Sequence, residues 1–420
     1  MVLVVGALVA GCSSASTETA PPATTPDSGI LAGYPTDHDA VSPLLISALA
    51  PAPVPVMGTD GKVHVVYELE VLNFSPREAT PTRLETVVGG PDGEVVSTLE
   101  GEDLARQTLV VLGEGGSIPL GDTGVILVDD VYDSHDDVPV SVTHRLSATF
   151  GPASPDLADA WESSFDGDPV TATGGPVAIS SESPVVIGPP LAGAGWYAWN
   201  GCCGPSTHRR SFFPVGGRLN FGERYGVDWV KPDLTLDAAA IAASIEAGYL
   251  PTFEDDPTDN DAYGAYGEPL LAVADGTVVT VTSGMPDELP ESAPTGLSAA
   301  ELGGNYVVLD IGDGVYAFYA HLSPGGATVE VGDEVTRGQV IGRVGNSGNT
   351  TEAHLHFHLM RAPAPLSGDN VAFEIDAFGY AGSMDLEADP FEGFTPGPDA
   401  GARADQLPLE TSVVDFPEVR

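Results

Sequence analysis

The chain has 420 residues, and 15 Lys and Arg stand against 61 Asp and Glu, so its formal net charge is −46. This charge argues against nucleic acid and anionic membrane surfaces as partners, because both are themselves strongly negative. With 42% hydrophobic residues, the length is sufficient for two domains that each have their own core.

The N-terminal segment, residues 1–12, is apolar and ends in Val9-Ala10-Gly11-Cys12. It is too short to span a bilayer, which needs about 20 apolar residues. The segment resembles a bacterial lipoprotein signal peptide with a lipobox, and this implies lipidation of Cys12. We therefore expect an exported protein that is lipid-anchored to the outer face of the bacterial cell membrane. The alternative is a short hydrophobic N-terminus that is not processed.

A stretch rich in Thr, Pro and Ala follows and predicts a flexible tether over 13–42. Residues 43–182 then contain short runs rich in β-branched residues, separated by Gly, Pro and Asp. This spacing predicts an immunoglobulin-like β-sandwich domain. The predicted strands are 64–74, 84–88, 94–99, 108–112, 124–129 and 138–150. Residues 151–185 are rich in Pro, Ser and Asp, and we expect them to link or edge this domain and a second one over 183–395.

Two cysteines, Cys202 and Cys203, are adjacent near the start of the second domain. A trans peptide would hold their Cα atoms about 3.8 Å apart, below the usual disulfide range. In an exported protein a vicinal disulfide is nonetheless favoured. The alternatives are free or intermolecular thiols and metal ligation together with His208. The nearby aromatic residues are expected either in the core or along a groove: Trp196, Tyr197 and Trp199.

Two further features of the second domain are expected on composition alone. Residues 236–247 have helical composition, whereas the acidic segment 254–261 lacks the calcium-loop pattern and favours a solvated loop. After Thr395 the sequence predicts a poorly ordered tail over 396–420.

Three of the nine histidines of the chain, His354, His356 and His358, stand at a spacing of two after a glycine-rich loop. Side chains alternate between the two faces of a strand, so these imidazoles are expected on one face. The other face is apolar, with Leu355, Phe357 and Leu359. This pattern predicts a metal or catalytic site.

The segment GNSGNTTEAHLHFH resembles the HxH signature of the lysostaphin-type (LytM-like) zinc endopeptidases, which cut peptide bonds in peptidoglycan. Segments 266–279, 303–322 and 329–345 follow the order of strands and turns in that family. The resemblance implies a mainly β protein whose second domain is a LytM-like antiparallel β-sheet peptidase with one zinc ion. Carried over to this chain, Asp228 and His356 would bind zinc. His354 would be the general base, and His321 would hydrogen-bond the oxyanion.

The chain departs from the family at the first metal ligand, where Arg224 stands in place of histidine. A guanidinium group has no free lone pair and cannot coordinate a cation. Either Arg224 points away from the site, or the metal position is empty and Arg224 pairs with Asp228. Two histidines are candidates for the missing ligand, His208 from a neighbouring loop and His358 from the same strand.

The sequence therefore supports a cell-envelope metalloendopeptidase that hydrolyses peptidoglycan with metal-activated water. The alternative is a degenerate, non-catalytic family member that binds peptidoglycan or activates another cell-wall hydrolase. A biotinyl or lipoyl carrier is excluded, because no lysine follows Lys231 and such carriers need a lysine at a hairpin tip.

Overall fold

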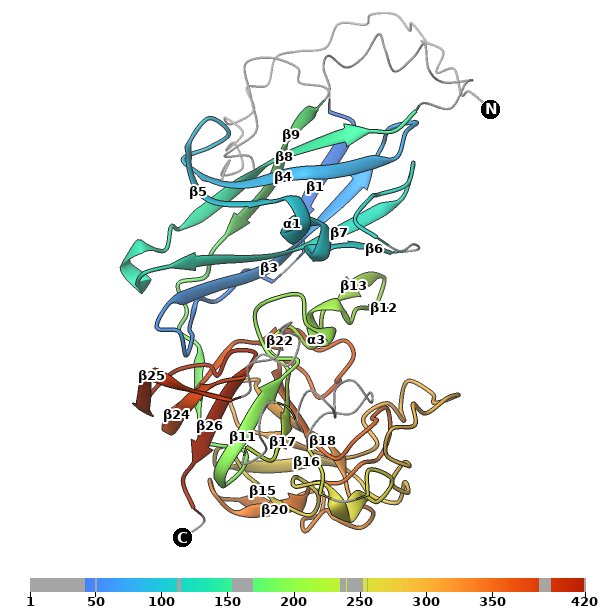
Figure 1. The fold of residues 1–420 in the computed structure, drawn as a ribbon, viewed down its shortest axis with the longest axis vertical. Coiled ribbons are helices and arrows are strands. Elements are labelled where there is room, and N and C mark those ends of the chain that lie inside the picture. Colours follow the sequence, from blue (N-terminus) through green and yellow to red (C-terminus); the bar gives the residue numbers. More distant parts are fainter. Residues whose placement is uncertain are drawn as a thin grey trace, which may run out of the picture. The chain divides into compact units, whose positions relative to one another are not determined.

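The structure is a computed structural model that describes residues 42–49, 51–111, 115–152, 169–234, 239, 252–254, 256–384 and 394–418. All of these residues belong to one compact unit. Strands far outweigh helices among the described residues (Figure 1), which confirms the predicted mainly β fold class. In the described part of the chain, no helix has the length and apolar character needed to cross a membrane.

The N-terminal region contains two antiparallel sheets. In the first, the strand order is β1-β3-β7-β6, and β2 also pairs with β3; in the second, it is β5-β4-β8-β9. The first sheet consists of β1 (Leu44–Ala48), β2 (Val56–Met57), β3 (Val63–Asn73), β6 (Thr108–Val110) and β7 (Thr123–Tyr132). The second consists of β4 (Ala79–Val88), β5 (Glu94–Glu100), β8 (Ser141–Phe150) and β9 (Val170–Ala178). Helix α1 (Gly101–Gln107) joins β5 to β6, and the short η2 (His135–Asp137) lies between β7 and β8.

A shared core fills the space between these two sheets. Apolar residues of β3 and β7 pack with those of β4 and β8, and the cluster includes Leu69, Ile126, Leu84 and Leu146. Alternate residues of a strand face the same side, so one face of each sheet supplies this core. Two packed sheets are the arrangement expected of a sandwich.

The C-terminal region is built on one large antiparallel sheet with the strand order β19-β16-β17-β18-β21-β14-β11-β26-β24-β25. Its strands are β11 (Gly193–Trp199), β14 (Val227–Val230), β16 (Gly276–Thr282), β17 (Asn305–Asp310), β18 (Tyr316–Leu322), β19 (Glu334–Val335), β21 (Leu355–Met360), β24 (Phe378–Ser383), β25 (Thr395–Arg403) and β26 (Ser412–Phe416), and β22 (Asn370–Val371) pairs with β21.

Smaller pairs surround this sheet: β10 (Val185–Ile187) with β23 (Phe373–Ile375), β12 (Phe213–Val215) with β13 (Arg218–Asn220), and β15 (Pro269–Leu271) with β20 (Val340–Arg343). The four-residue helix α3 (Thr207–Arg210) and the turn η3 (Asn260–Ala262) complete the described elements.

Strand β21 occupies a central place in the large sheet. Its apolar residues Leu355, Phe357 and Leu359 are fully buried in the main core, as the alternation of the sequence predicts. On one side Asp228 of β14 pairs with His356, and on the other side Ala320 of β18 pairs with the same histidine. This register brings polar side chains of three neighbouring strands together.

Strands stand at all six positions predicted for the N-terminal region, with longer bounds at β4 and β7 and a later start at β8. Part of the segment that was expected to link or edge the two domains forms β9 at the edge of the second sheet, because Val170, Ala172 and Val177 fit the sandwich core. One expectation was wrong. The expected tail forms β25 and β26, and Phe416 of β26 packs edge-on against the buried Trp229 at 5.1 Å.

Several expectations fall outside the described residues: the signal peptide with Cys12, most of the tether and nearly all of the 236–247 segment. The acidic segment is described apart from residue 255, and part of it forms η3. Of the three aromatic residues near the cysteines, Trp196 and Tyr197 are buried, whereas Trp199 lines a groove.

Candidate metal centre and groove

His208, Asp228 and His356 bring three potential metal-binding atoms together, and all three residues line one groove. Nε2 of His208 lies 3.1 Å from Nδ1 of His356, and the Asp228 carboxylate lies 3.2 Å from His208 and 3.0 Å from His356. All three side chains are buried. Zinc bonds of about 2.0–2.1 Å in a tetrahedral arrangement place the ligand atoms roughly 3.3 Å apart. The spacing and chemistry of these three groups therefore fit a zinc ion.

His208 reaches this position from α3, whose N-terminus is capped by the Ser206 hydroxyl. Gly226 leaves room for its ring, since a Cβ atom at that position would lie 3.1 Å from Nδ1 of His208. Asn200, from the loop after β11, donates a hydrogen bond of 2.9 Å to Asp228. This contact was missed by the sequence analysis, because no motif marks a lone asparagine in a loop.

Charge pairing holds Asp228 ionised. Burial on its own would raise the pKa of this carboxyl, but His208 and then His354 hold it well below its usual range. Burial would also lower the pKa of His208, yet Asp228 raises it to about 9. In the absence of an ion, the buried negative charge is thus balanced by imidazolium. A bound divalent cation would neutralise the Asp228 carboxylate in place of the imidazolium.

Arg224 lies away from this cluster. Its guanidinium pairs with Glu68 of β3, and its Nε lies 2.9 Å from the Glu68 carboxylate. The ion pair with Asp228 that was considered from the sequence is therefore absent from the structure, because Glu68 supplies the countercharge instead. Of the two arrangements considered for Arg224, the structure has the one in which it points away from the site.

His358 lies beside the cluster rather than within it. Its Nδ1 is 2.8 Å from Nε2 of His356, on the far side of that ring from Asp228. Burial, then the neighbouring His356, holds the pKa of His358 well below its usual range, so it stays neutral. A neutral His358 can accept a hydrogen bond from Nε2 of His356, which leaves Nδ1 of His356 free to bind a metal.

His321 and His354 face each other near the same site, with ring centroids 4.7 Å apart. Nδ1 of His321 donates to the Ser347 carbonyl at 2.7 Å, and Nδ1 of His354 donates to the Glu352 carbonyl at 2.9 Å. Both bonds fix the ring orientation and leave Nε2 as the functional nitrogen. The backbone of His321 has a φ of 63°, an uncommon conformation for a non-glycine residue and one that recurs at functional sites.

The cluster opens into a groove of about 700 Å³ that is lined by all of these histidines except His358. Its walls are mainly apolar and come from segments far apart in the sequence: Trp199, Phe213, Pro294, Leu302, Phe318 and Leu366. Glu223 and Asp228 are the acidic residues along it. A groove of this size accommodates an extended peptide segment.

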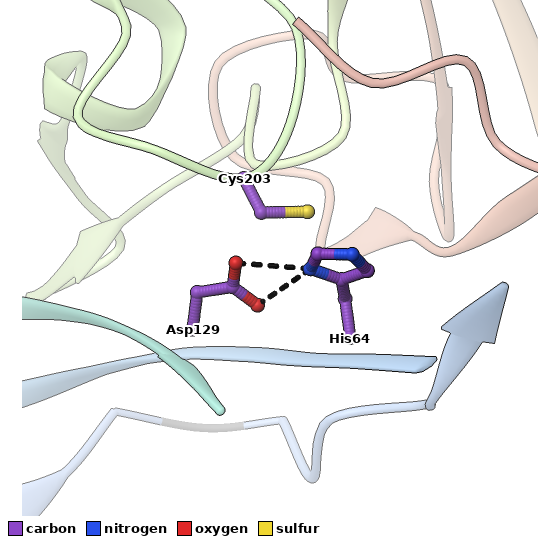
Figure 2. Close-up of side chains that lie close together, drawn as sticks. All are labelled: His64, Asp129 and Cys203. Carbon is purple, nitrogen blue, oxygen red and sulfur yellow. Dashed lines mark hydrogen bonds and ion pairs between the residues drawn. The ribbon is translucent and has the colours of Figure 1, made fainter. Parts of the chain in front are cut away.

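A second group of potential ligands among the described residues consists of His64, Asp129 and Cys203 (Figure 2). Cys203 is bonded to Cys202 in a vicinal disulfide, across a cis peptide that places the Cα atoms 3.0 Å apart. A disulfide sulfur is not a thiolate, which is the form that binds metals. His64 instead forms ion pairs with Asp129 and Asp60, which outweigh burial and raise its pKa to about 10.

Comparison with known proteins is consistent with this arrangement. Residues 260–368 match the family model described as Peptidase family M23. It is 37% identical over 101 residues to glycyl-glycine endopeptidase ALE-1 of Staphylococcus capitis, which covers 24% of this chain and 23% of the relative. It is also 42% identical over 64 residues to peptidoglycan DD-endopeptidase ShyA of Vibrio cholerae, which covers 15% of this chain and 14% of the relative.

The chain thus spans less than a quarter of the length of either of these relatives. Among solved structures, the catalytic domain of lysostaphin from Staphylococcus simulans is 22% identical, with a TM-score of 0.22. That comparison covers 42% of this chain and 88% of the other.

Proposed function

We propose that this protein is a cell-envelope metalloendopeptidase that hydrolyses peptide bonds in peptidoglycan, with zinc held by His208, Asp228 and His356. The observation that carries the proposal is the convergence of these three side chains at 3.0–3.2 Å beside two oriented histidines. The relatives named as a glycyl-glycine endopeptidase and a peptidoglycan DD-endopeptidase support this substrate class.

In this proposal His208 replaces the histidine that the family places at position 224. The ligand comes from a different segment, but the donor set of two imidazoles and one carboxylate stays the same. Such three-ligand sets keep a position open for water and are typical of catalytic zinc sites. Bound zinc would supply Lewis-acid activation of that water and of the scissile carbonyl.

Histidine side chains beside the proposed metal position would carry out the proton transfers. Nε2 of His354 lies 3.3 Å from Asp228, next to the proposed metal position, and we assign it the role of general base that later protonates the leaving amine. Burial, then His354 and His356, holds the pKa of His321 well below its usual range, so its Nε2 is an acceptor. We therefore propose that His321 orients the attacking water, in place of the oxyanion contact expected from the sequence.

The alternative function is a non-catalytic member that binds peptidoglycan or activates another cell-wall hydrolase. Arg224 at the family's first ligand position is the feature that favours it. The test is to purify the full chain, measure its zinc content and incubate it with peptidoglycan. Zinc-dependent release of new amino termini supports the peptidase. Binding to peptidoglycan without cleavage, in a zinc-loaded protein, supports the alternative.

We propose further that Cys12 is lipidated and anchors the exported protein to the outer face of the cell membrane. The lipobox-like sequence supports this. Mass spectrometry of the protein isolated from bacterial membranes tests it: a diacylglyceryl group on Cys12 is expected, and the Cys12→Ser variant should leave the membrane fraction. An unmodified Cys12 would contradict the anchor.

A further inference from the structure

Strand β3 of the N-terminal region is buried on both faces. Val65, Tyr67 and Leu69 point into the core between the two N-terminal sheets. The alternate residues His64, Val66 and Glu68 would face solvent in an isolated sandwich. They are instead only 5%, 0% and 0% exposed, and Val66 belongs to the core cluster that contains Trp229 and Phe357. The C-terminal region therefore covers this face of β3.

Glu68 is the charged residue at the centre of that buried face, and it meets two arginines. Arg224 pairs with both carboxylate oxygens, and Nη2 of Arg209 lies 3.4 Å from one of them. Arg209 and Arg224 are 1% and 4% exposed. A fully buried carboxylate is retained only where charged partners compensate for its lost hydration. Although burial raises the pKa of Glu68, the two arginines outweigh it and keep the group ionised.

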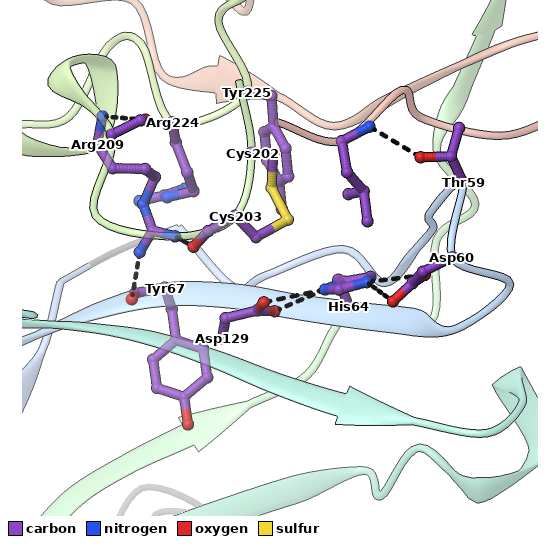
Figure 3. The surroundings of a disulfide bond; sticks show 12 residues. Thr59, Asp60, His64, Tyr67, Asp129, Cys202, Cys203, Arg209, Arg224 and Tyr225 are labelled. Carbon is purple, nitrogen blue, oxygen red and sulfur yellow. Dashed lines mark hydrogen bonds and ion pairs between the residues drawn. A yellow bond between two sulfur atoms is a disulfide. The ribbon is translucent and has the colours of Figure 1, made fainter. Parts of the chain in front are cut away.

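Each of these arginines belongs to a segment that carries a proposed metal ligand. Arg209 directly follows His208 in α3, and Arg224 stands four residues before Asp228. Arg209 also donates to the carbonyl of Cys203 at 2.7 Å and to that of Tyr67 at 3.3 Å (Figure 3). Arg209 donates a further bond of 3.4 Å to the carbonyl of Val128. It therefore ties the α3 segment to β3 and β7 at once.

We propose that Glu68 is a positioning residue for the metal centre: through Arg209 and Arg224 it holds in place the two segments that carry His208 and Asp228. The inference rests on the proposed zinc site and extends it, because it makes metal affinity depend on the N-terminal sandwich. None of the three proposed ligands lies in the sandwich.

The segment that carries His208 needs support from outside because its helix is short. Helix α3 has only four residues, too few to be stable alone. Asp228, in contrast, is held in β14 between β11 and β21. A shift of α3 by about 1 Å would take Nε2 of His208 out of bonding distance of a metal at 2.0–2.1 Å, while the other two ligands stayed in place. Replacement of Glu68 should therefore displace His208 more than the other two proposed ligands.

The test compares zinc affinity in the full chain of the parent, Glu68→Gln and Glu70→Gln, measured by competition with a chromophoric chelator. Glu70 is a matched control, since it has the same chemistry on the same face of β3 but accepts a hydrogen bond of 3.2 Å from the neutral Ser47 hydroxyl. We expect Glu68→Gln to weaken zinc binding at least tenfold and Glu70→Gln to change it less than twofold. Circular dichroism confirms folding of each variant. A folded Glu68→Gln with parental affinity overturns the proposal.

Glu68→Gln leaves two buried guanidinium groups without a carboxylate, and this variant could fail to fold. A second variant, Arg209→Gln, therefore tests the same proposal. Arg209→Gln retains the pair between Glu68 and Arg224 and should fold, yet it frees α3. We expect at least tenfold weaker zinc binding in Arg209→Gln. Parental affinity in this variant overturns the positioning role. If the parent takes up no zinc, the proposed metal site is wrong. If the parent and both variants bind zinc equally well, the metal site stands and only the positioning role of Glu68 is wrong.

Discussion

Nε2 of His208 lies 3.1 Å from Nδ1 of His356, although 148 residues separate the two in the chain. One comes from a four-residue helix in a loop and the other from the central strand of the large sheet. Their approach, with Asp228 in contact with both, provides three metal-binding groups even though position 224 is an arginine.

His208→Ala should lower the affinity for zinc by at least a hundredfold, because it leaves two protein ligands where catalytic zinc sites have three. His135→Ala is the control, since His135 is an exposed histidine of the N-terminal region. Equilibrium titration against a chelator measures both. Equal affinity of His208→Ala and the parent would mean that His208 is not a ligand.

His354→Ala and His356→Ala should separate chemistry from metal binding. His354→Ala should abolish peptidoglycan cleavage but keep its zinc, because it removes a proton carrier and no ligand. His356→Ala should lose both. Cleavage assays together with elemental analysis of each variant test this division. If the two variants retain zinc equally, the assigned roles are wrong.

Arg224→His should destabilise the protein without tightening zinc binding. The substitution takes away the main partner of a buried carboxylate, and breaking such a pair costs about 3–5 kcal/mol. His208 already provides the ligand, so a new histidine has nothing to restore. Urea unfolding and zinc titration measure the two effects. Zinc binding tightened by orders of magnitude would show that the parent site lacks a ligand.

The pH dependence of stability should carry a contribution from His64. Its hydrogen bonds to Asp129 and Asp60 raise its pKa in the folded protein to about 10, from an ordinary value of 6.5. Protonated His64 therefore stabilises the fold fully below pH 6.5, and this contribution is lost as the pH rises through 10. The difference between the two pKa values limits the contribution to a few kcal/mol.

Urea unfolding of the parent, His64→Gln and His135→Gln at pH 6, 8 and 10 checks this contribution. The parent and His135→Gln should lose stability over this range more steeply than His64→Gln. Parallel pH profiles of all three proteins would contradict it.

The site could be predicted from the sequence where its residues lie on regular strands. His354 and His356 follow the period of two, and the apolar residues between them reveal the buried face. The choice between His208 and His358 could not be made, because His208 comes from a loop whose position depends on tertiary contacts with β3 and β7. Likewise, nothing in the local sequence pairs Glu68 with Arg224, 156 residues away.

The C-terminal strands illustrate the same limit. The composition of 395–403, with Pro, Gly and Asp, does not favour a strand. It forms one because β24 offers a paired edge, and β26 is held by the apolar contact of Phe416 with Trp229. Tertiary context decided both outcomes, whereas the strands of the N-terminal region followed from their own β-branched residues.

The most direct test of the account is the location of zinc in crystals of the full chain grown with the ion, by anomalous scattering at the zinc edge. We predict one strong peak between Nε2 of His208, the Asp228 carboxylate and Nδ1 of His356. No peak at this position, or a peak whose ligands exclude His208, would contradict the central claim.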